Sequence, residues 1–169
     1  MRLLILFTFL ITNVFASDVS EIKNIVIHKN PKKLENIIFL DKKDHEINIS
    51  NFIGNLIILN FWATWCEPCK EEMPSLDRLQ VNSKLANLKV FPINIGKENK
   101  IKVDEFFEKF NIKNFEPYFD SEVTLAKKFL LRGVPTSILI DKNGQEFARV
   151  VGSINFDSKS FINWLKDYN

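Results

Sequence analysis

Two cysteines are the residues of this chain best suited to chemistry, and both lie in one motif, CEPC, at residues 66–69. An apolar run at residues 56–61 precedes the motif and is typical of a buried strand, and a helical pattern begins at Lys70. Cys66 is therefore expected at a helix N-terminus, where unpaired N–H groups and the helix dipole favour a thiolate. The thiolate is the nucleophile of disulfide exchange, and Cys69, one helical turn later, can resolve the mixed disulfide. We expect Cys66 to be the exposed thiol and Cys69 the buried one.

Two other interpretations of the motif are weaker. A structural zinc site needs four ligands and CxxC supplies two, while the only histidines, His28 and His45, are not spaced as a pair. A purely structural disulfide across so short a loop would remove little entropy from the unfolded chain. The motif therefore predicts a redox dithiol, with no metal and no cofactor.

Two segments of the chain carry a resemblance to a known family. Residues 60–74, NFWATWCEPCKEEMP, resemble the active-site segment of thioredoxin-fold proteins of the TlpA/ResA-like branch. Residues 132–136, RGVPT, and the apolar run after them resemble the cis-proline loop and next strand of that fold, and residues 141–144, DKNG, match its hairpin turn. The segments occur in the order that the family requires, and the resemblance covers roughly residue 32 to the C-terminus.

Several residues near the motif are expected to contact the client protein. Trp65 directly precedes the nucleophile and is expected to shield the sulfurs from water. Glu67 and Pro68 lie inside the loop, where the charge of Glu67 disfavours the thiolate and so favours a reducing couple. The resemblance implies a cis bond between Val134 and Pro135, with the Val134 backbone pairing with an extended client segment.

Glu72 is a candidate for proton transfer. It lies three residues beyond Cys69, so on a helix it shares a side with that cysteine. Thioredoxin has a buried Asp at the position equivalent to Asn60, and ResA-like proteins have a Glu at the place of Glu72. The resemblance therefore implies that Glu72 accepts the proton of Cys69. The alternative is an exposed acid of the first helical turn, like Glu71.

The N-terminus indicates export. Arg2 precedes an almost wholly apolar run at residues 3–15. The segment Val14-Phe15-Ala16 then offers small residues at the positions that a signal peptidase recognises. The run, about 13 residues long, is shorter than the roughly 20 that span a bilayer as a helix. We expect a signal peptide or uncleaved anchor at 1–16, a polar lead at 17–31 and a thioredoxin-like domain at 32–169. The domain would then lie in the periplasm or at the extracytoplasmic face, with a membrane contact only if residues 3–15 are retained.

Strand patterns alternate with helical ones, which predicts an α/β sheet with helices on both faces. The resemblance makes this a thioredoxin fold: a central mixed β-sheet flanked by helices, with an N-terminal β-hairpin and a central strand/helix insertion. The hairpin is expected at 37–49 and the insertion near 100–119, where a helix should bury Ile101, Val103 and Phe106. A second hairpin at 137–151 and a helix at 156–168 should close the chain.

The resemblance implies an exported thiol-disulfide oxidoreductase that reduces client disulfides, in apocytochrome c or a copper-site protein of an oxidase, and is regenerated by a membrane thiol protein. A general periplasmic disulfide oxidase or isomerase, or a redox-inert binding module, remain alternatives. A peroxiredoxin-type peroxidase would need Thr where Ala63 lies, and a Sco-type copper chaperone would need CxxxC. The net charge of +2 gives no indication of nucleic-acid binding.

Overall fold

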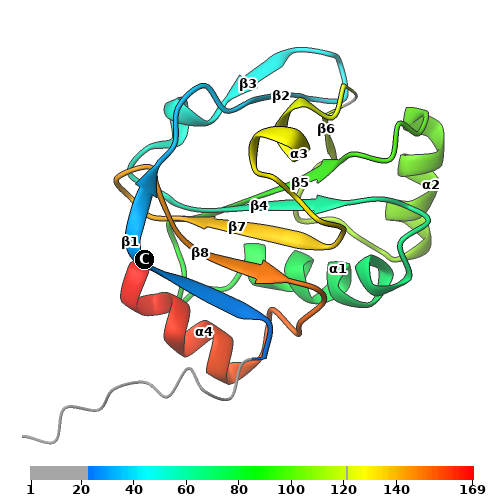
Figure 1. Cartoon of the computed structure of the whole chain (residues 1–169). Helices are drawn as coiled ribbons and strands as arrows, with labels where there is room; N and C mark the ends of the chain where they lie inside the picture. Colours follow the sequence, from blue (N-terminus) through cyan, green and yellow to red (C-terminus); the bar gives the residue numbers. More distant parts are fainter. Residues whose placement is uncertain (1–22, 121) are drawn as a thin grey trace, which may run out of the picture.

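The fold is built on one mixed sheet. A computed structural model describes residues 23–120 and 122–169, and over these residues the sheet has eight strands in the order β1-β8-β7-β4-β5-β6-β2-β3. In Figure 1, β4 lies in the middle of this sheet, between β7 and β5. The strands are β1 (Ile25–Lys33), β2 (Ile38–Leu40), β3 (Glu46–Asn48), β4 (Leu56–Trp62), β5 (Leu88–Asn94), β6 (Tyr118–Phe119), β7 (Thr136–Ile140) and β8 (Gln145–Val151).

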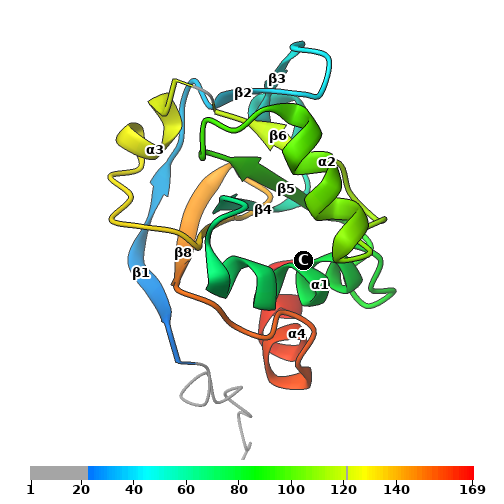
Figure 2. The ribbon, with the colours of Figure 1, turned by 90° about the vertical axis from the view of Figure 1, so that its right-hand side faces the viewer.

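Helices cover both faces of this sheet, as expected. Figure 1 shows α1 and α4 below the central strands and α3 above them, and Figure 2 shows α2 beside β5. The described α-helices are α1 (Glu67–Gln80), α2 (Lys100–Lys109), α3 (Thr124–Lys128) and α4 (Lys159–Leu165), with 3₁₀ turns at Ile49–Phe52 and Lys166–Tyr168. The terminal helix thus begins later than expected, because Ser158 caps it by accepting from the N–H of Phe161.

β4 divides the core into two clusters. All seven of its side chains are buried, and it pairs in parallel with β5 and antiparallel with β7. Because successive side chains of a strand point to opposite faces, Ile58 and Trp62 pack with α1, α2 and α4, while Leu59 and Phe61 pack with α3. The ring of Trp62 lies 4.6 Å from that of Phe106 on α2. A strand buried on both faces explains the continuous apolar run.

Most of the expected elements are present. The hairpin of β2 and β3, the short strand β6 and the hairpin of β7 and β8 confirm the sequence prediction. Gly144 takes a φ of +76° in the last turn, which suits a residue without a Cβ. The prediction for Ile101 was wrong: it is 69% exposed, whereas Val103 and Phe106 are buried. Ile101 lies in the first turn of α2, at the margin of its apolar face.

β1 is a further difference from expectation. Residues 17–31 were expected to form a polar lead, but residues 25–33 pair with β8, with Ile25 opposite Val150 and Ile27 opposite Ala148. Most β1 side chains are exposed, so this edge strand lacks the apolar pattern that would identify it. Residues 1–22, with the expected signal segment, lie outside the described residues. Within residues 23–120 and 122–169, no helix combines the length and the apolar character needed to cross a bilayer.

An ion-pair cluster ties β1 to β8. The Glu146 carboxylate is 1% exposed, lies 2.6 Å from Nε2 of His28 and accepts from Nη2 of Arg149 at 3.1 Å. Nη1 of Arg149 also donates to the carbonyl of Phe129 at 2.8 Å. Burial alone would raise the pKa of Glu146, but hydrogen bonds from Arg149 and His28 outweigh it and hold that pKa below its usual value.

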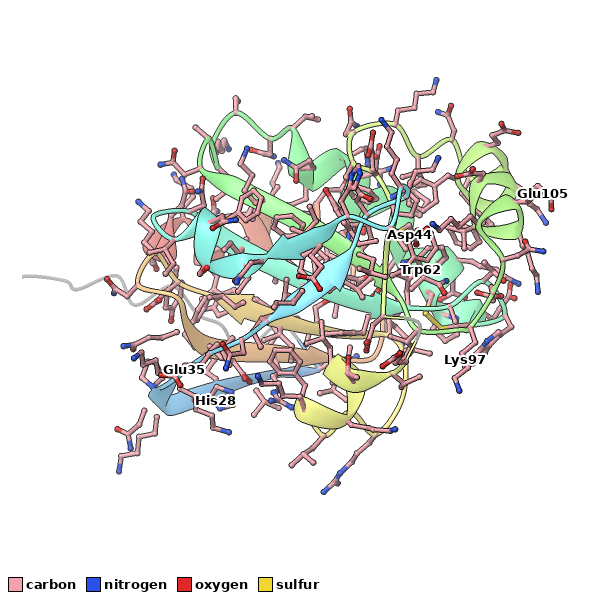
Figure 3. The ribbon with its side chains drawn as sticks, turned by 90° about the horizontal axis from the view of Figure 1, so that it is seen from above. His28, Glu35, Asp44, Trp62, Lys97 and Glu105 are labelled. Atoms are coloured by element: carbon pink, nitrogen blue, oxygen red, sulfur yellow. A yellow bond between two sulfur atoms is a disulfide. The ribbon has the colours of Figure 1, made fainter. Side chains whose placement is uncertain are left out.

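We predict that Glu146→Gln destabilises the fold by roughly 3 kcal/mol, because the substitution leaves the partly buried Arg149 without its counter-charge. The control is Glu35→Gln, which removes an exposed ion pair with Lys33 and should change stability little. Figure 3 shows His28 and Glu35 near β1. Urea unfolding at neutral pH measures both variants, and equal midpoints would contradict a structural role for the cluster.

Candidate active site

The two cysteines form a disulfide at the start of α1. Cys66 is the N-cap of the helix, its Sγ accepts from the N–H of Cys69 at 3.2 Å, and the two Cα atoms are 5.3 Å apart. Cys66 is 4% exposed and Cys69 0%. Cys66 was expected to be exposed; in the disulfide it is nearly buried, because the bond holds it against the same apolar cluster as Cys69. The disulfide thus lies at the N-terminus of a helix, as the motif predicted.

The residues on either side of Cys66 are exposed. Trp65, the residue before Cys66, is 63% exposed, so its side chain lies at the surface. Glu67 and Pro68 form the exposed first turn of α1. Nζ of Lys70 lies 2.6 Å from Oε2 of Glu67, and this ion pair offsets part of the charge that Glu67 adds near the sulfurs.

The Val134–Pro135 peptide bond is cis, as the resemblance implied. Pro135 is buried and accepts from the N–H of Gly152 at 3.0 Å, while Val134 packs against the cluster that holds both cysteines. Val134 and Trp65 line one cavity of about 580 Å³, together with apolar residues of α3 and its flanks and two cations; the further lining residues are Ile95, Val123, Ala126, Lys127, Leu130, Leu131, Arg132 and Gly133. The fold thus places two expected client-binding residues in one groove, whereas the other three, Glu67, Pro68 and Pro135, do not line it.

Glu72 is a buried residue of α1, the helix that begins at the disulfide. It is 1% exposed, and its Oε1 accepts from Nδ2 of Asn60 at 2.8 Å. The same Asn60 amide donates to Oγ of Ser137 at 2.9 Å. Among the described residues, Oε2 of Glu72 has no hydrogen-bond partner. The arrangement excludes the alternative of an exposed first-turn acid.

Burial changes the chemistry of this carboxyl. Loss of water raises the pKa of Glu72 to about 8, although the hydrogen bond from Asn60 and the nearby backbone of Ile154 lower it in part. Glu72 therefore titrates close to the range of a cysteine thiol, whose ordinary pKa is about 8.5. A carboxyl in this range can exchange a proton with Cys69 near neutral pH.

Sequence reasoning missed two polar side chains next to the site. Ser137 shares the Asn60 amide with Glu72, and Glu98 accepts from the backbone N–H of Thr64 at 2.9 Å. Each pair is separated by at least 34 residues, so no local spacing could indicate it. Over the described residues, no group of three or more His, Cys, Asp or Glu is placed to hold a metal ion.

Comparisons with known proteins agree with this geometry. The AhpC/TSA family model matches residues 31–145. The thiol-disulfide oxidoreductase ResA of Geobacillus kaustophilus (strain HTA426) is 33% identical over 69% of this chain and 66% of its own. ResA of Bacillus thuringiensis subsp. konkukian (strain 97-27) is 31% identical over 72% of this chain and 69% of its own. The structure of a putative thiol:disulfide interchange protein DsbE from Chlorobium tepidum covers 82% of this chain and 96% of its own, with a TM-score of 0.71 at 24% identity.

The fold and the CxxC disulfide define a thioredoxin-fold redox site. The chain belongs to the AhpC/TSA family, in its branch of ResA-like thiol-disulfide oxidoreductases. It spans about two thirds of the length of these curated relatives, 66% and 69%. The likeness to the Chlorobium structure supports the thioredoxin fold itself.

We predict that Glu72→Gln changes how stability depends on pH. The pKa of Glu72 rises from 4.5 to about 8 on folding, so the folded protein holds more protons between these values and loses stability as pH rises through them. The neutral glutamine abolishes this loss. Relative to the natural protein, the oxidised variant should gain a few kcal/mol between pH 5 and pH 8.

Glu71→Gln is the matched control, because Glu71 is the exposed neighbour on the same helical turn. Chemical unfolding of the oxidised proteins across this pH range makes the comparison. A difference between Glu72→Gln and the natural protein that does not vary with pH would show that the carboxyl is already ionised in the fold.

Proposed function

We propose that the protein reduces disulfides of client proteins outside the cytoplasm, with Cys66 as nucleophile and Cys69 as resolving cysteine. The observation that carries the proposal is the disulfide at the N-terminus of α1, next to the groove that Trp65 and Val134 line. Family membership supports the chemistry, and the apolar N-terminal run supports the location.

The reaction transfers two electrons from the reduced protein to the client. The Cys66 thiolate attacks one client sulfur, which breaks the client disulfide and releases its other sulfur as a thiolate. Cys69 then loses its proton and attacks Sγ of Cys66, which releases the second client thiolate and forms the Cys66–Cys69 disulfide. Each client thiolate takes up a proton. The disulfide seen in the structure is the product of this half-reaction.

Glu72 is proposed to take the proton of Cys69 in the second step. It lies one helical turn from that cysteine, in a buried setting that raises its pKa to about 8. A base of this pKa can accept a proton from a thiol of ordinary pKa with little free-energy cost. When the protein is reduced again, the same carboxyl can return the proton.

Two features of the site favour the reducing direction. Both sulfurs are buried, and burial opposes the thiolate form. Glu67 adds a negative charge inside the motif, although Lys70 offsets part of it. A strong oxidant needs a reduced form that is especially stable, and neither feature supplies that stability. The compartment outside the cytoplasm already contains oxidants that make disulfides. The activity that a dedicated dithiol protein could add there is the reduction of disulfides.

The proposed clients are exported proteins whose cysteines must be free to bind a cofactor, such as apocytochrome c or an oxidase copper-site protein. A client segment would lie in the groove with an apolar side chain against Trp65 and Leu130. The backbone of Val134 would pair with this segment by strand addition. Regeneration requires a membrane thiol protein that supplies two electrons, because the proposed reaction leaves Cys66 and Cys69 oxidised.

An equilibrium redox titration of Cys66 and Cys69 tests the direction. We expect a potential near the thioredoxin value of about −270 mV, because burial and Glu67 both oppose the thiolate. The measurement uses a dithiothreitol buffer series with alkylation of the reduced fraction. A potential near −120 mV would make the protein an oxidase. If Cys66 and Cys69 do not exchange with any disulfide, the protein is a redox-inert binding module.

Trapping tests the roles of the two cysteines. Cys69→Ser should accumulate a mixed disulfide between Cys66 and a client, because the resolving attack is lost. Cys66→Ser is the matched control and should trap far less, since Cys69 is 0% exposed and cannot reach a client. Non-reducing electrophoresis and mass spectrometry identify the captured protein. Stronger trapping by Cys66→Ser would reverse the assigned roles.

A further inference from the structure

The loop after β5 holds the residues that precede Cys66. The Glu98 carboxylate accepts from the N–H of Thr64 at 2.9 Å and from its hydroxyl Oγ1. It also accepts from Nδ2 of Asn94 at 3.0 Å and lies 3.3 Å from Nζ of Lys102. The Glu98 side chain is only 5% exposed. This carboxylate therefore fixes the backbone two residues before the nucleophile.

The β5–α2 loop is shaped around this carboxylate. A Cβ atom added at Gly96 would lie 2.5 Å from Oε2 of Glu98 and 2.8 Å from its Cδ, so glycine leaves the space that Glu98 fills. The N–H of Gly96 donates to Oδ1 of Asn94 at 3.0 Å, and the N–H of Ile95 donates to the carbonyl of Trp62 at 3.0 Å. These bonds join the loop to the end of β4.

Topology explains why residues so far apart in the sequence meet. β4 and β5 are parallel, with Trp62 opposite Asn94 at their last pair, so the segments that follow both strands emerge at one edge of the sheet. Figure 3 shows Lys97 of this loop at the end of the molecule where the disulfide lies. Ile95 and Trp65 also line the client groove together.

The charge of Glu98 persists at neutral pH. Burial alone would raise its pKa, but hydrogen bonds from Thr64 and Asn94 and the contact with Lys102 outweigh burial and lower the pKa. The group is therefore an anion close to the active-site loop. A nearby negative charge disfavours a second one, including a thiolate on Cys66.

We propose that Glu98 is a positioning residue for disulfide exchange: it holds Thr64, so that Trp65 and Cys66 are presented to the client, and its charge destabilises the Cys66 thiolate. The inference rests on the proposed function for its role in exchange. Its effect on Cys66 can be measured without any client.

Four variants test this inference. Glu98→Gln removes the charge, and Gly96→Ala displaces the carboxylate while keeping its charge in the chain. The double variant tests whether both act through one contact. The control is Glu105→Gln, which removes an exposed carboxylate on α2 that Figure 3 shows pointing away from the site. Each reduced protein is alkylated with iodoacetamide across a pH series, and each is assayed for reduction of insulin disulfides.

We expect the alkylation profile of Cys66 to shift by about half a pH unit towards lower pH in Glu98→Gln, and in the same direction in Gly96→Ala. Insulin reduction should slow about tenfold in both, because a loosened loop presents the nucleophile poorly. The double variant should be no slower than either single variant. Glu105→Gln should match the natural protein in both measurements.

Two results would overturn the inference. One is an unchanged alkylation profile with a lowered unfolding midpoint, which would make Glu98 a purely structural residue. The other is fully additive loss in the double variant. If Glu98→Gln does not fold, Thr64→Val removes only the hydroxyl contact, and an insulin rate equal to that of the natural protein would count against the role. If the natural protein itself does not reduce insulin, the proposed function is contradicted. The alkylation profiles would still test the effect of Glu98 on Cys66, because they need no client.

Discussion

The burial of β4 is the constraint on which the rest of the structure depends. Every side chain of this strand is inside, and its two faces anchor the two halves of the core. Its end fixes where Cys66 caps α1, and its parallel pairing with β5 brings the next loop to the same edge. The position of the redox site therefore follows from one central strand. Moving this strand would disrupt the packing of both halves of the core.

Two carboxylates of the same residue type have opposite environments around this strand. Glu72 is buried with one oxygen that has no partner among the described residues, and burial raises its pKa to about 8. Glu98 is also nearly buried, but Thr64, Asn94 and Lys102 donate to it or lie beside it, and its pKa is lowered. The number of donors, rather than burial alone, decides which carboxyl carries a proton and which carries a charge.

Other buried acids hold neighbouring segments of the fold together. Oδ1 of Asp77 accepts from the N–H groups of Lys113 and Asn114, which fixes the segment after α2 against α1. Asp120 accepts from the N–H groups at the start of α3, including those of Leu125 and Ala126, and so caps the helix that borders the groove. These side chains satisfy backbone donors that would otherwise lose water without replacement.

The sequence by itself determined the redox motif, the central strand, both hairpins and the order of the elements, because these depend on residues close together in the chain. It also implied the cis Val134–Pro135 bond through a resemblance. Only the tertiary structure showed that β1 joins the sheet, since an exposed edge strand is held by backbone hydrogen bonds that leave no apolar pattern. Only the fold decided the protonation of Glu72 and the contact of Glu98 with Thr64, because burial and long-range hydrogen bonds depend on which segments the sheet brings together.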